Sequence, residues 1–276
     1  MIDLRPRPGH PYLAGAPLLI AHRGGSSLAP ENTLLAFERA LLWWRADLLE
    51  LDVRLTRDGR VVVIHDSALD RTTNGSGEVR DHTLAQVQAL DAGYRFTSDG
   101  GATFPFRDNG IRVPTLDEVL VAFPAARLNV EIKEGAVQTA ARDLIARAGA
   151  EHRVLVAAGN HSDRSEFSDY TGARSASEKE LRQFYICHRL HLTRLYSPAV
   201  DAFQMPERHG GKQILTPRLV RDAHAKNLAV HVWTVDEIAD MERLLTWGVD
   251  GIVTDRPDRL ARTLHARYGR PPPPGP

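Results

Sequence analysis

The stretch LLIAHRGGSSLAPENTLLAFERALLWWRADLLELDV, residues 18–53, decides the fold class. It begins and ends with short, largely apolar runs, 18–22 and 48–53, each as long as a buried strand. Between these runs a capping residue, Asn32 or Thr33, precedes a helix with an apolar stripe at Leu34, Phe37, Leu41 and Trp44. The order of strand, helix and strand predicts two parallel strands with the helix packed across them.

Similar apolar runs recur along the rest of the chain, and helix-like segments separate most of them. The runs are 61–65, 128–132, 153–158, 229–233 and 251–255, with weaker candidates at 173–177 and 200–205. Thr216 with Pro217 is typical of a helix start, and Gly248 of a helix end. The alternation indicates a parallel sheet covered by helices, and 276 residues suit one α/β barrel, which typically has about 250.

An eight-stranded barrel leaves one of these nine candidates over, and a hairpin accounts for it. Asp58-Gly59 lies between the extended runs of LDVRLTRDGRVVVIHD (51–66), which is a hairpin signal. A hairpin there brings Asp52 close to His65. The segment 66–115 is rich in turn residues and weakly periodic, so we expect a small insertion after His65.

Composition limits the partners of the protein. Its 35 basic and 35 acidic residues give a net charge of zero, so no overall field favours nucleic acid or an anionic surface. No window reaches the roughly 18 apolar residues of a membrane span, and no run of signal-peptide length comes first. The single cysteine, Cys187, excludes an internal disulfide. We therefore expect a cytoplasmic protein of one domain, 1–276, with a core at about 18–258 and a disordered proline-rich tail at 267–276.

Histidines and glycines at strand ends are the first candidates for chemistry. His22-Arg23-Gly24-Gly25 follows an apolar strand, and strand ends in an α/β barrel face the active site. Arginine suits phosphate or carboxylate, and histidine exchanges protons near neutral pH. His65-Asp66 ends a second run and offers the other half of an acid–base pair. A turn with a capping arginine, and a structural histidine, are the alternatives.

Carboxylates at alternating strand positions are the second group of candidates. Glu50 and Asp52 share one face of a strand, as do Glu131 and Lys133 of VEIK. Two carboxylates buried side by side require a cation or a proton between them, and hard oxygen ligands suit Mg²⁺ or Ca²⁺. A solvated strand edge and a plain ion pair are the alternatives.

A zinc site is a weaker hypothesis. Cys187 lies beside His188 and His191, but no fourth ligand has a suitable spacing. A solvated helix face is the better interpretation of these residues.

The motifs HRG, PENT (30–33), ELDV (50–53), TRDGRVVVIHD (56–66), LDRTTNGSG (69–77), VEIK (130–133), VWTV (232–235) and DGIVTDRP (250–257) occur in this order. Together they make the chain resemble the glycerophosphodiester phosphodiesterase family over roughly residues 18–258. The resemblance implies a distorted (β/α)₈ TIM barrel with a small insertion after the second histidine. It also implies hydrolysis of glycerophosphodiesters, which are small molecules, to sn-glycerol 3-phosphate and an alcohol with Mg²⁺ or Ca²⁺.

The resemblance also suggests a role for each matching residue. It implies acid–base histidines at His22 and His65, metal ligands at Glu50, Asp52 and Glu131, phosphate contacts at Arg23 and Lys133, and substrate-positioning residues at Glu31 and Trp233. Glu31 is expected to position Arg23 or to belong to the metal shell. Trp233 is expected to pack on glycerol, with a core strand residue as the alternative. Asp255 is interpreted as structural.

The chain departs from the family pattern at two places. Arg45 stands where a glycine is usual, so the turn there is expected to differ. Residues 159–177 are less similar and could line the leaving-group side. Alternative functions are a lysophospholipase D or sphingomyelinase D-like activity, or a non-catalytic phosphate-binding barrel. The alcohol headgroup, the choice of metal, the nucleophile (water or the substrate's 2-hydroxyl), the acid and base assignment and the oligomeric state remain open.

Overall fold

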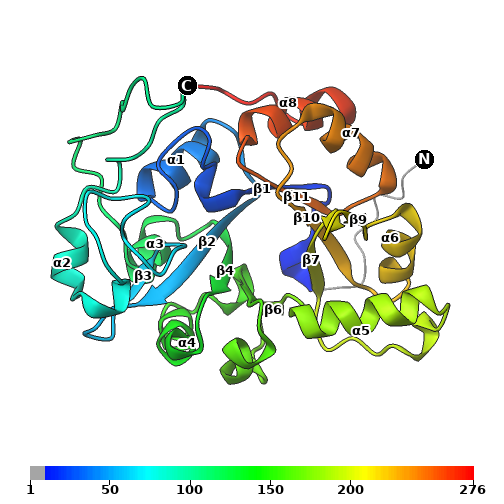
Figure 1. The fold of residues 1–276 in the computed structure, drawn as a ribbon. Coiled ribbons are helices and arrows are strands. Elements are labelled where there is room, and N and C mark those ends of the chain that lie inside the picture. Colours follow the sequence, from blue (N-terminus) through cyan, green and yellow to red (C-terminus); the bar gives the residue numbers. More distant parts are fainter. Residues whose placement is uncertain (1–9) are drawn as a thin grey trace.

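A ring of eight parallel strands forms the centre of the protein (Figure 1). The computed structural model describes residues 10–276. Around the ring the strands are β6 (Ala173–Arg174), β5 (Val154–Ala157), β4 (Arg127–Ile132), β2 (Leu48–Leu55), β1 (Leu18–Ala21), β11 (Gly251–Thr254), β10 (Ala229–Trp233) and β7 (Ala202–Pro206). A single parallel bridge between Ser175 and Ala202 links β6 to β7. The predicted (β/α)₈ barrel is confirmed, and its weakest closure is at β6.

Helices surround the barrel, as Figure 1 shows. They are α1 (Leu34–Leu42), α3 (Leu116–Ala122), α4 (Gln138–Arg147), α5 (Glu178–Arg189), α6 (Pro217–His224), α7 (Ile238–Trp247) and α8 (Pro257–Tyr268). Between β5 and β6 the connection contains 3₁₀ turns, His161–Phe167, in place of an α-helix. None of the helices within residues 10–276 is long and apolar enough to cross a membrane.

The ninth strand candidate is the second arm of a hairpin. β3 (Val61–Val63) pairs with β2 in antiparallel fashion, with Val53 opposite Val63. The Ile64 N–H donates to the Asp52 carbonyl at 2.9 Å, which brings His65 to the end of β2. The hairpin predicted from Asp58-Gly59 is therefore confirmed.

Alternation along β2 explains why charged residues lie at one end of the barrel. Leu49, Leu51 and Val53 belong to the hydrophobic core between the sheet and the helices. Leu48 points the other way and packs inside the barrel with apolar residues of the neighbouring strands. Successive side chains of a strand alternate between its faces, so Glu50, Asp52 and Arg54 continue the inner face of β2 toward its carboxyl end. The apolar lower layer of the barrel thus gives way to a polar upper layer.

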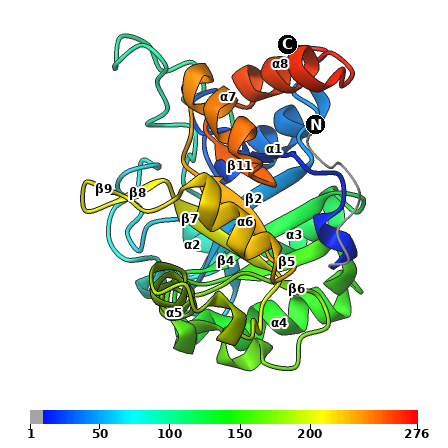
Figure 2. The ribbon, with the colours of Figure 1, turned by 90° about the vertical axis from the view of Figure 1, so that its right-hand side faces the viewer.

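Residues 66–115 supply no strand to the parallel sheet. They contain one short α-helix, α2 (Leu84–Gln88), and pack around a small apolar cluster of Val62, Ile64, Leu69, Val79, Val87, Ala92 and Val113. In Figure 2 the segment that carries α2 and the hairpin of β8 (Arg208–His209) and β9 (Lys212–Gln213) project on the same side of the barrel. That side is where β2 and β7 end, so both border the barrel mouth.

The turn after α1 keeps a left-handed residue although it lacks a glycine. Arg45 has φ of 53°, and its Nε donates to the carbonyl of Pro272 at 3.1 Å. The expectation that Arg45 changes this turn is wrong. The C-terminal helix extends to Tyr268, two residues into the segment 267–276. Beyond it, the Gly275 N–H donates to the Trp43 carbonyl at 3.0 Å.

Candidate active site

Three carboxylates from two neighbouring strands converge at the barrel mouth. Asp52 of β2 pairs in register with Glu131 of β4, and Glu50 lies one inward position below Asp52. One ligand oxygen from each carboxylate lies within 4.8 Å of the others. Glu50 is only 4% exposed and Asp52 only 1%, so the alternative of a solvated strand edge is wrong for these two residues. The structure brings together the three residues named as metal ligands.

The electrostatics of this cluster suit a divalent cation. Burial, together with repulsion from Asp52 and Glu131, raises the pKa of Glu50 to about 8. Burial also acts to raise the pKa of Asp52, but Lys133 and Arg23 hold it below its usual value. Asp52 Oδ1 is buried and accepts no hydrogen bond. Hard carboxylate oxygens are the ligands that Mg²⁺ and Ca²⁺ prefer, so these residues fit such an ion.

Two cationic side chains flank the carboxylates. Lys133 Nζ lies 3.4 Å from Asp52 Oδ1 and donates to Glu131 Oε1 at 3.1 Å. Arg23 Nε lies 3.3 Å from Asp52 Oδ2, and the Arg23 backbone N–H donates to Glu50 Oε2 at 2.9 Å. The pair named as phosphate-binding residues therefore lies on either side of Asp52.

The glycines after Arg23 make this backbone approach possible. Gly24 has φ of +85°, and a Cβ there would lie 2.7 Å from the Ala36 Cβ of α1. A side chain at this position would push the His22–Gly25 turn away from α1. Close packing of this turn on α1 holds Arg23 N–H over Glu50.

Asp255 positions the first histidine. His22 Nδ1 lies 2.5 Å from Asp255 Oδ1, and His22 Nε2 lies 3.9 Å from Glu50 Oε2. Burial acts to lower the pKa of His22. The hydrogen bond to Asp255 and the charge of Glu50 raise it by more, so the pKa of His22 lies above its ordinary value. Asp255, interpreted from the sequence as structural, therefore contacts a residue of the candidate site. The signal that could have identified it is its place at a strand end, like His22 itself.

A network of hydrogen bonds positions the second histidine. His65 Nδ1 lies 2.6 Å from Asp66 Oδ1, and Arg71 Nε donates to Asp66 Oδ2 at 2.5 Å. Arg71 also forms two hydrogen bonds of 2.7 Å with Glu31, which accepts a hydrogen bond from Arg23 at 2.9 Å. Glu31 therefore contacts Arg23 and lies outside the carboxylate cluster. Arg71 was missed by sequence reasoning, although it lies within the LDRTTNGSG motif.

Asn32 was also missed as a site residue. Its Nδ2 donates to Asp52 Oδ2 at 2.9 Å, whereas Thr33 is the residue that caps α1. The short amide holds the Asp52 carboxylate in one orientation. Two residues of the PENT motif thus contact the site: Glu31 binds Arg23, and Asn32 binds Asp52.

Trp233 lies across the barrel from these residues. It ends β10, which is four strands from β4 around the ring of eight. Its side chain is 45% exposed, so the alternative of a core strand residue is wrong. An exposed ring at the mouth is available to pack against a substrate.

The cysteine and histidines of α5 form no comparable cluster. His188 is only 5% exposed, and its Nδ1 lies 2.6 Å from Asp222 Oδ2. The expected solvated helix face is therefore wrong for His188, although His191 is exposed. Within residues 10–276, the only group of three or more potential ligands with metal-site geometry is Glu50, Asp52 and Glu131.

Comparisons with known proteins agree with this arrangement. Residues 22–259 match the model of the glycerophosphoryl diester phosphodiesterase family. A glycerophosphodiester phosphodiesterase of Caldanaerobacter subterraneus subsp. tengcongensis is 37% identical over 250 residues, which cover 88% of this chain and 96% of that protein. A crystal structure of a glycerophosphoryl diester phosphodiesterase domain from Mycobacterium tuberculosis has a TM-score of 0.79 at 24% identity and covers 92% of this chain and 100% of that one.

A further solved structure is that of an Oleispira antarctica phosphodiesterase in complex with the product sn-glycerol-3-phosphate. It has a TM-score of 0.69 at 24% identity, covers 90% of this chain and 97% of that chain, and so shares the fold. The family model spans nearly the whole barrel, and the Caldanaerobacter protein matches the chain over almost all of its length. The chain belongs to the glycerophosphodiester phosphodiesterase family and is an enzyme of that family.

Proposed function

We propose that this enzyme hydrolyses glycerophosphodiesters to sn-glycerol 3-phosphate and an alcohol, with a divalent cation, Mg²⁺ or Ca²⁺, held by Glu50, Asp52 and Glu131. The observation that carries the proposal is the pair of aspartate-held histidines around one buried carboxylate cluster. The Oleispira phosphodiesterase of the same fold, solved with sn-glycerol-3-phosphate, supports this product.

The side chains divide the reaction between them. When bound, the cation neutralises charge on the phosphate and orients it. Arg23 and Lys133 bind the non-bridging oxygens, and Glu31 keeps the guanidinium of Arg23 in place. Trp233 packs against the glycerol moiety.

The two histidines move the protons. In each imidazole an aspartate accepts from Nδ1–H, which leaves Nε2 to exchange a proton with the substrate. One histidine takes the proton of the nucleophile, and the other donates a proton to the leaving alcohol oxygen. The nucleophile is water or the substrate's own 2-hydroxyl, and only the second route passes through a cyclic phosphate, which a water then opens to sn-glycerol 3-phosphate.

The test is release of glycerol 3-phosphate from glycerophosphocholine and glycerophosphoethanolamine, with and without EDTA. We expect EDTA to abolish turnover and Mg²⁺ or Ca²⁺ to restore it. Glu131→Gln should require more metal for half-maximal rate, while Glu242→Gln on the exposed face of α7 serves as the matched control. Full activity after exhaustive chelation would remove the cation from the mechanism. A cyclic phosphate seen by ³¹P NMR early in the reaction would identify the 2-hydroxyl as nucleophile.

A further inference from the structure

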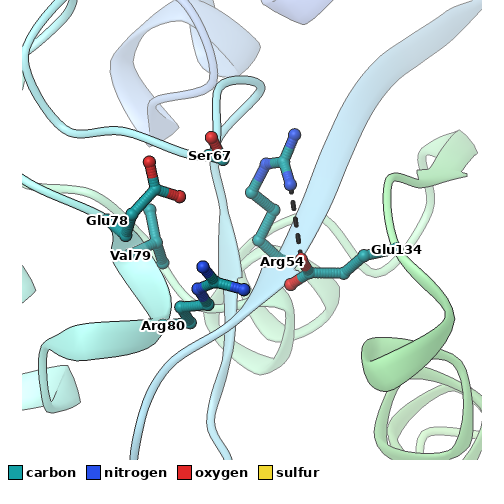
Figure 3. Close-up of a pocket in the computed structure, with 6 residues that line it drawn as sticks. All are labelled: Arg54, Ser67, Glu78, Val79, Arg80 and Glu134. Atoms are coloured by element: carbon teal, nitrogen blue, oxygen red, sulfur yellow. Dashed lines mark hydrogen bonds and ion pairs between the residues drawn. The ribbon is translucent and has the colours of Figure 1, made fainter.

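A cavity of about 240 Å³ lies between Arg54 of β2, Glu134 and residues 67–80 of the segment that follows His65 (Figure 3). We call it the headgroup cavity. It is lined by Arg54, Ser67, Glu78, Val79, Arg80 and Glu134. None of these residues is among the metal, phosphate or proton-transfer residues proposed above, so the cavity is an additional feature of the mouth.

Two contacts join the headgroup cavity to the site. Arg54 Nε donates to the carbonyl of His65 at 2.8 Å. Glu134 follows Lys133 in the chain, and its Oε1 accepts a hydrogen bond from the Leu55 N–H at 3.1 Å. The cavity therefore borders the site on the side of β2 and β4, because Ser67 lies two residues beyond His65 and Glu134 lies one residue beyond Lys133.

The position of the headgroup cavity corresponds to one end of a bound diester. Trp233 ends β10, which lies opposite β4 in the ring of strands. A diester whose phosphate lies at the carboxylate cluster, with its glycerol on Trp233, extends its other ester group toward the cavity. The leaving alcohol is the group at that end.

The charges of the lining select the chemistry of that alcohol. The cavity has two guanidinium groups and two carboxylates, and Figure 3 shows Arg54 reaching toward Glu134, at 3.4 Å. Within residues 10–276 the side chains of Glu78 and Arg80 have no hydrogen-bond or ion-pair partner. A purely cationic headgroup leaves Arg80 without a partner, and an acyl chain leaves both Glu78 and Arg80 without one. A headgroup with a positive and a negative charge provides partners for both the carboxylates and the guanidinium groups of the lining.

We propose that the headgroup cavity is the subsite for the leaving alcohol and that it prefers an alcohol carrying both an ammonium and a carboxylate, as in a serine headgroup. The ammonium contacts Glu78 and Glu134, and the carboxylate contacts Arg80 and Arg54. The inference deepens the proposed function and rests on it, because the cavity acts only if the chain cleaves glycerophosphodiesters.

The first test compares kcat/KM for glycerophosphoserine, glycerophosphoethanolamine, glycerophosphocholine and glycerophosphoglycerol at saturating Mg²⁺. One extra charge-assisted hydrogen bond corresponds to a factor of about ten to a hundred. We expect glycerophosphoserine to exceed glycerophosphocholine by at least about tenfold. Equal values for all four diesters, or a preference for the uncharged glycerol headgroup, would overturn the proposal.

Charge-neutral variants then test each half of the recognition. Arg80→Gln should lower the ratio of kcat/KM for the serine diester to that for the ethanolamine diester by about tenfold, because only the serine headgroup has a carboxylate. Glu78→Gln should lower the ratio for the ethanolamine diester to that for the glycerol diester. Arg147→Gln, exposed at the end of α4 and away from the mouth, is the control and should change neither ratio.

The outcomes separate the two proposals. Hydrolysis of all four diesters with ratios that Arg80→Gln and Glu78→Gln leave unchanged contradicts the subsite alone. Absence of glycerol 3-phosphate release from every diester contradicts the proposed function, and the subsite with it. Thermal melting of each variant shows whether it is folded, and the ratios are independent of the fraction of active enzyme.

Discussion

At the scale of single residues, the two histidines share one arrangement. His22 and His65 each bind an aspartate through Nδ1, and each Nε2 is left for the substrate. Their surroundings differ, because Glu50 lies near His22 whereas Arg71 binds the aspartate of His65. Although burial acts to lower the pKa of His22, its hydrogen bond to Asp255 keeps the pKa above the ordinary value, and this suits His22 to the role of the acid.

The first prediction tests this assignment with an activated leaving group. On a natural glycerophosphodiester, His22→Ala and His65→Ala should each lower kcat by about 10²–10⁴-fold. A p-nitrophenyl leaving group needs no proton, so a glycerol p-nitrophenyl phosphodiester should restore much of the rate in His22→Ala and little in His65→Ala. Steady-state rates on both substrates give the answer. Restoration in His65→Ala alone would reverse the assignment, and wild-type rates in either variant on the natural diester would contradict it.

The second prediction concerns Asp255, which acts on the substrate only through His22. Asp255→Asn keeps the shape of the side chain but removes the charge that raises the pKa of His22. An acid must be protonated, so the alkaline limb of the profile of kcat/KM against pH should move to lower pH. The matched control is Asp222→Asn, because His188 and Asp222 form a similar pair of 2.6 Å outside the site. A profile unchanged in Asp255→Asn would show that Asp255 has only a structural role.

At the scale of elements, the ends of strands could be predicted from the sequence. An apolar run followed by charged residues is a local pattern that marks the end of a strand in any α/β barrel. The inner-face alternation of β2 and β4 was sufficient to predict the cluster of Glu50, Asp52 and Glu131. The contact of His22 with Asp255 was not predicted, since these residues are 233 positions apart and meet only when β11 closes the ring beside β1. Arg71 was missed because a loop without periodicity carries it.

Strand β6 is an element that the local sequence pattern predicts only weakly. It is only two residues long, and one bridge at Ser175 joins it to β7. Its pairing depends on closure of the whole sheet, so its sequence gives only a weak strand signal. The same dependence on distant contacts applies to Arg45, whose turn is stabilised by the carbonyl of Pro272.

The third prediction concerns the contact between the His22–Gly25 turn and α1. Gly24→Ala introduces a Cβ at 2.7 Å from Ala36 Cβ in a residue with φ of +85°. Gly59→Ala has a similar φ of +72° but nothing within 4 Å, so it measures the backbone cost alone. Overpacking typically costs about 1–3 kcal/mol, and we expect Gly24→Ala to lower the free energy of unfolding by about that much more than Gly59→Ala. Urea unfolding of both variants measures the difference, and equal losses would mean that α1 yields without strain.

At the scale of the whole molecule, a net charge of zero conceals a strong local imbalance. The barrel places three carboxylates together at its mouth, two of them buried, so folding the metal-free chain brings like charges into contact. Lys133 and Arg23 beside Asp52 reduce this repulsion, and the raised pKa of Glu50 allows that carboxylate to hold a proton. Stability of the fold and the proposed cation binding are therefore linked through Glu50.

The fourth prediction follows from this linkage. The pKa of Glu50 is about 8 in the folded protein, against an ordinary value of 4.5, so the folded state holds a proton that the unfolded chain has lost between these values. The contribution of Glu50 to stability is complete below about pH 4.5 and is lost as pH rises toward 8, by at most about 1.4 kcal/mol per pH unit. A cation replaces that proton, so the stabilisation by Mg²⁺ or Ca²⁺ should increase from pH 5 to about 8 and then level off.

Thermal melting at pH 5, 6, 7 and 8, with EDTA and with each cation, measures this dependence. Glu50→Gln should flatten the decline of Tm in EDTA and remove most of the stabilisation by the cation, because the amide neither titrates nor supplies a charged ligand. Glu242→Gln, exposed on α7, should behave like the wild type. If the cation raises Tm equally at pH 5 and 8, the proton of Glu50 is not displaced on binding. If Glu50→Gln is stabilised as much as the wild type, the cation is held elsewhere.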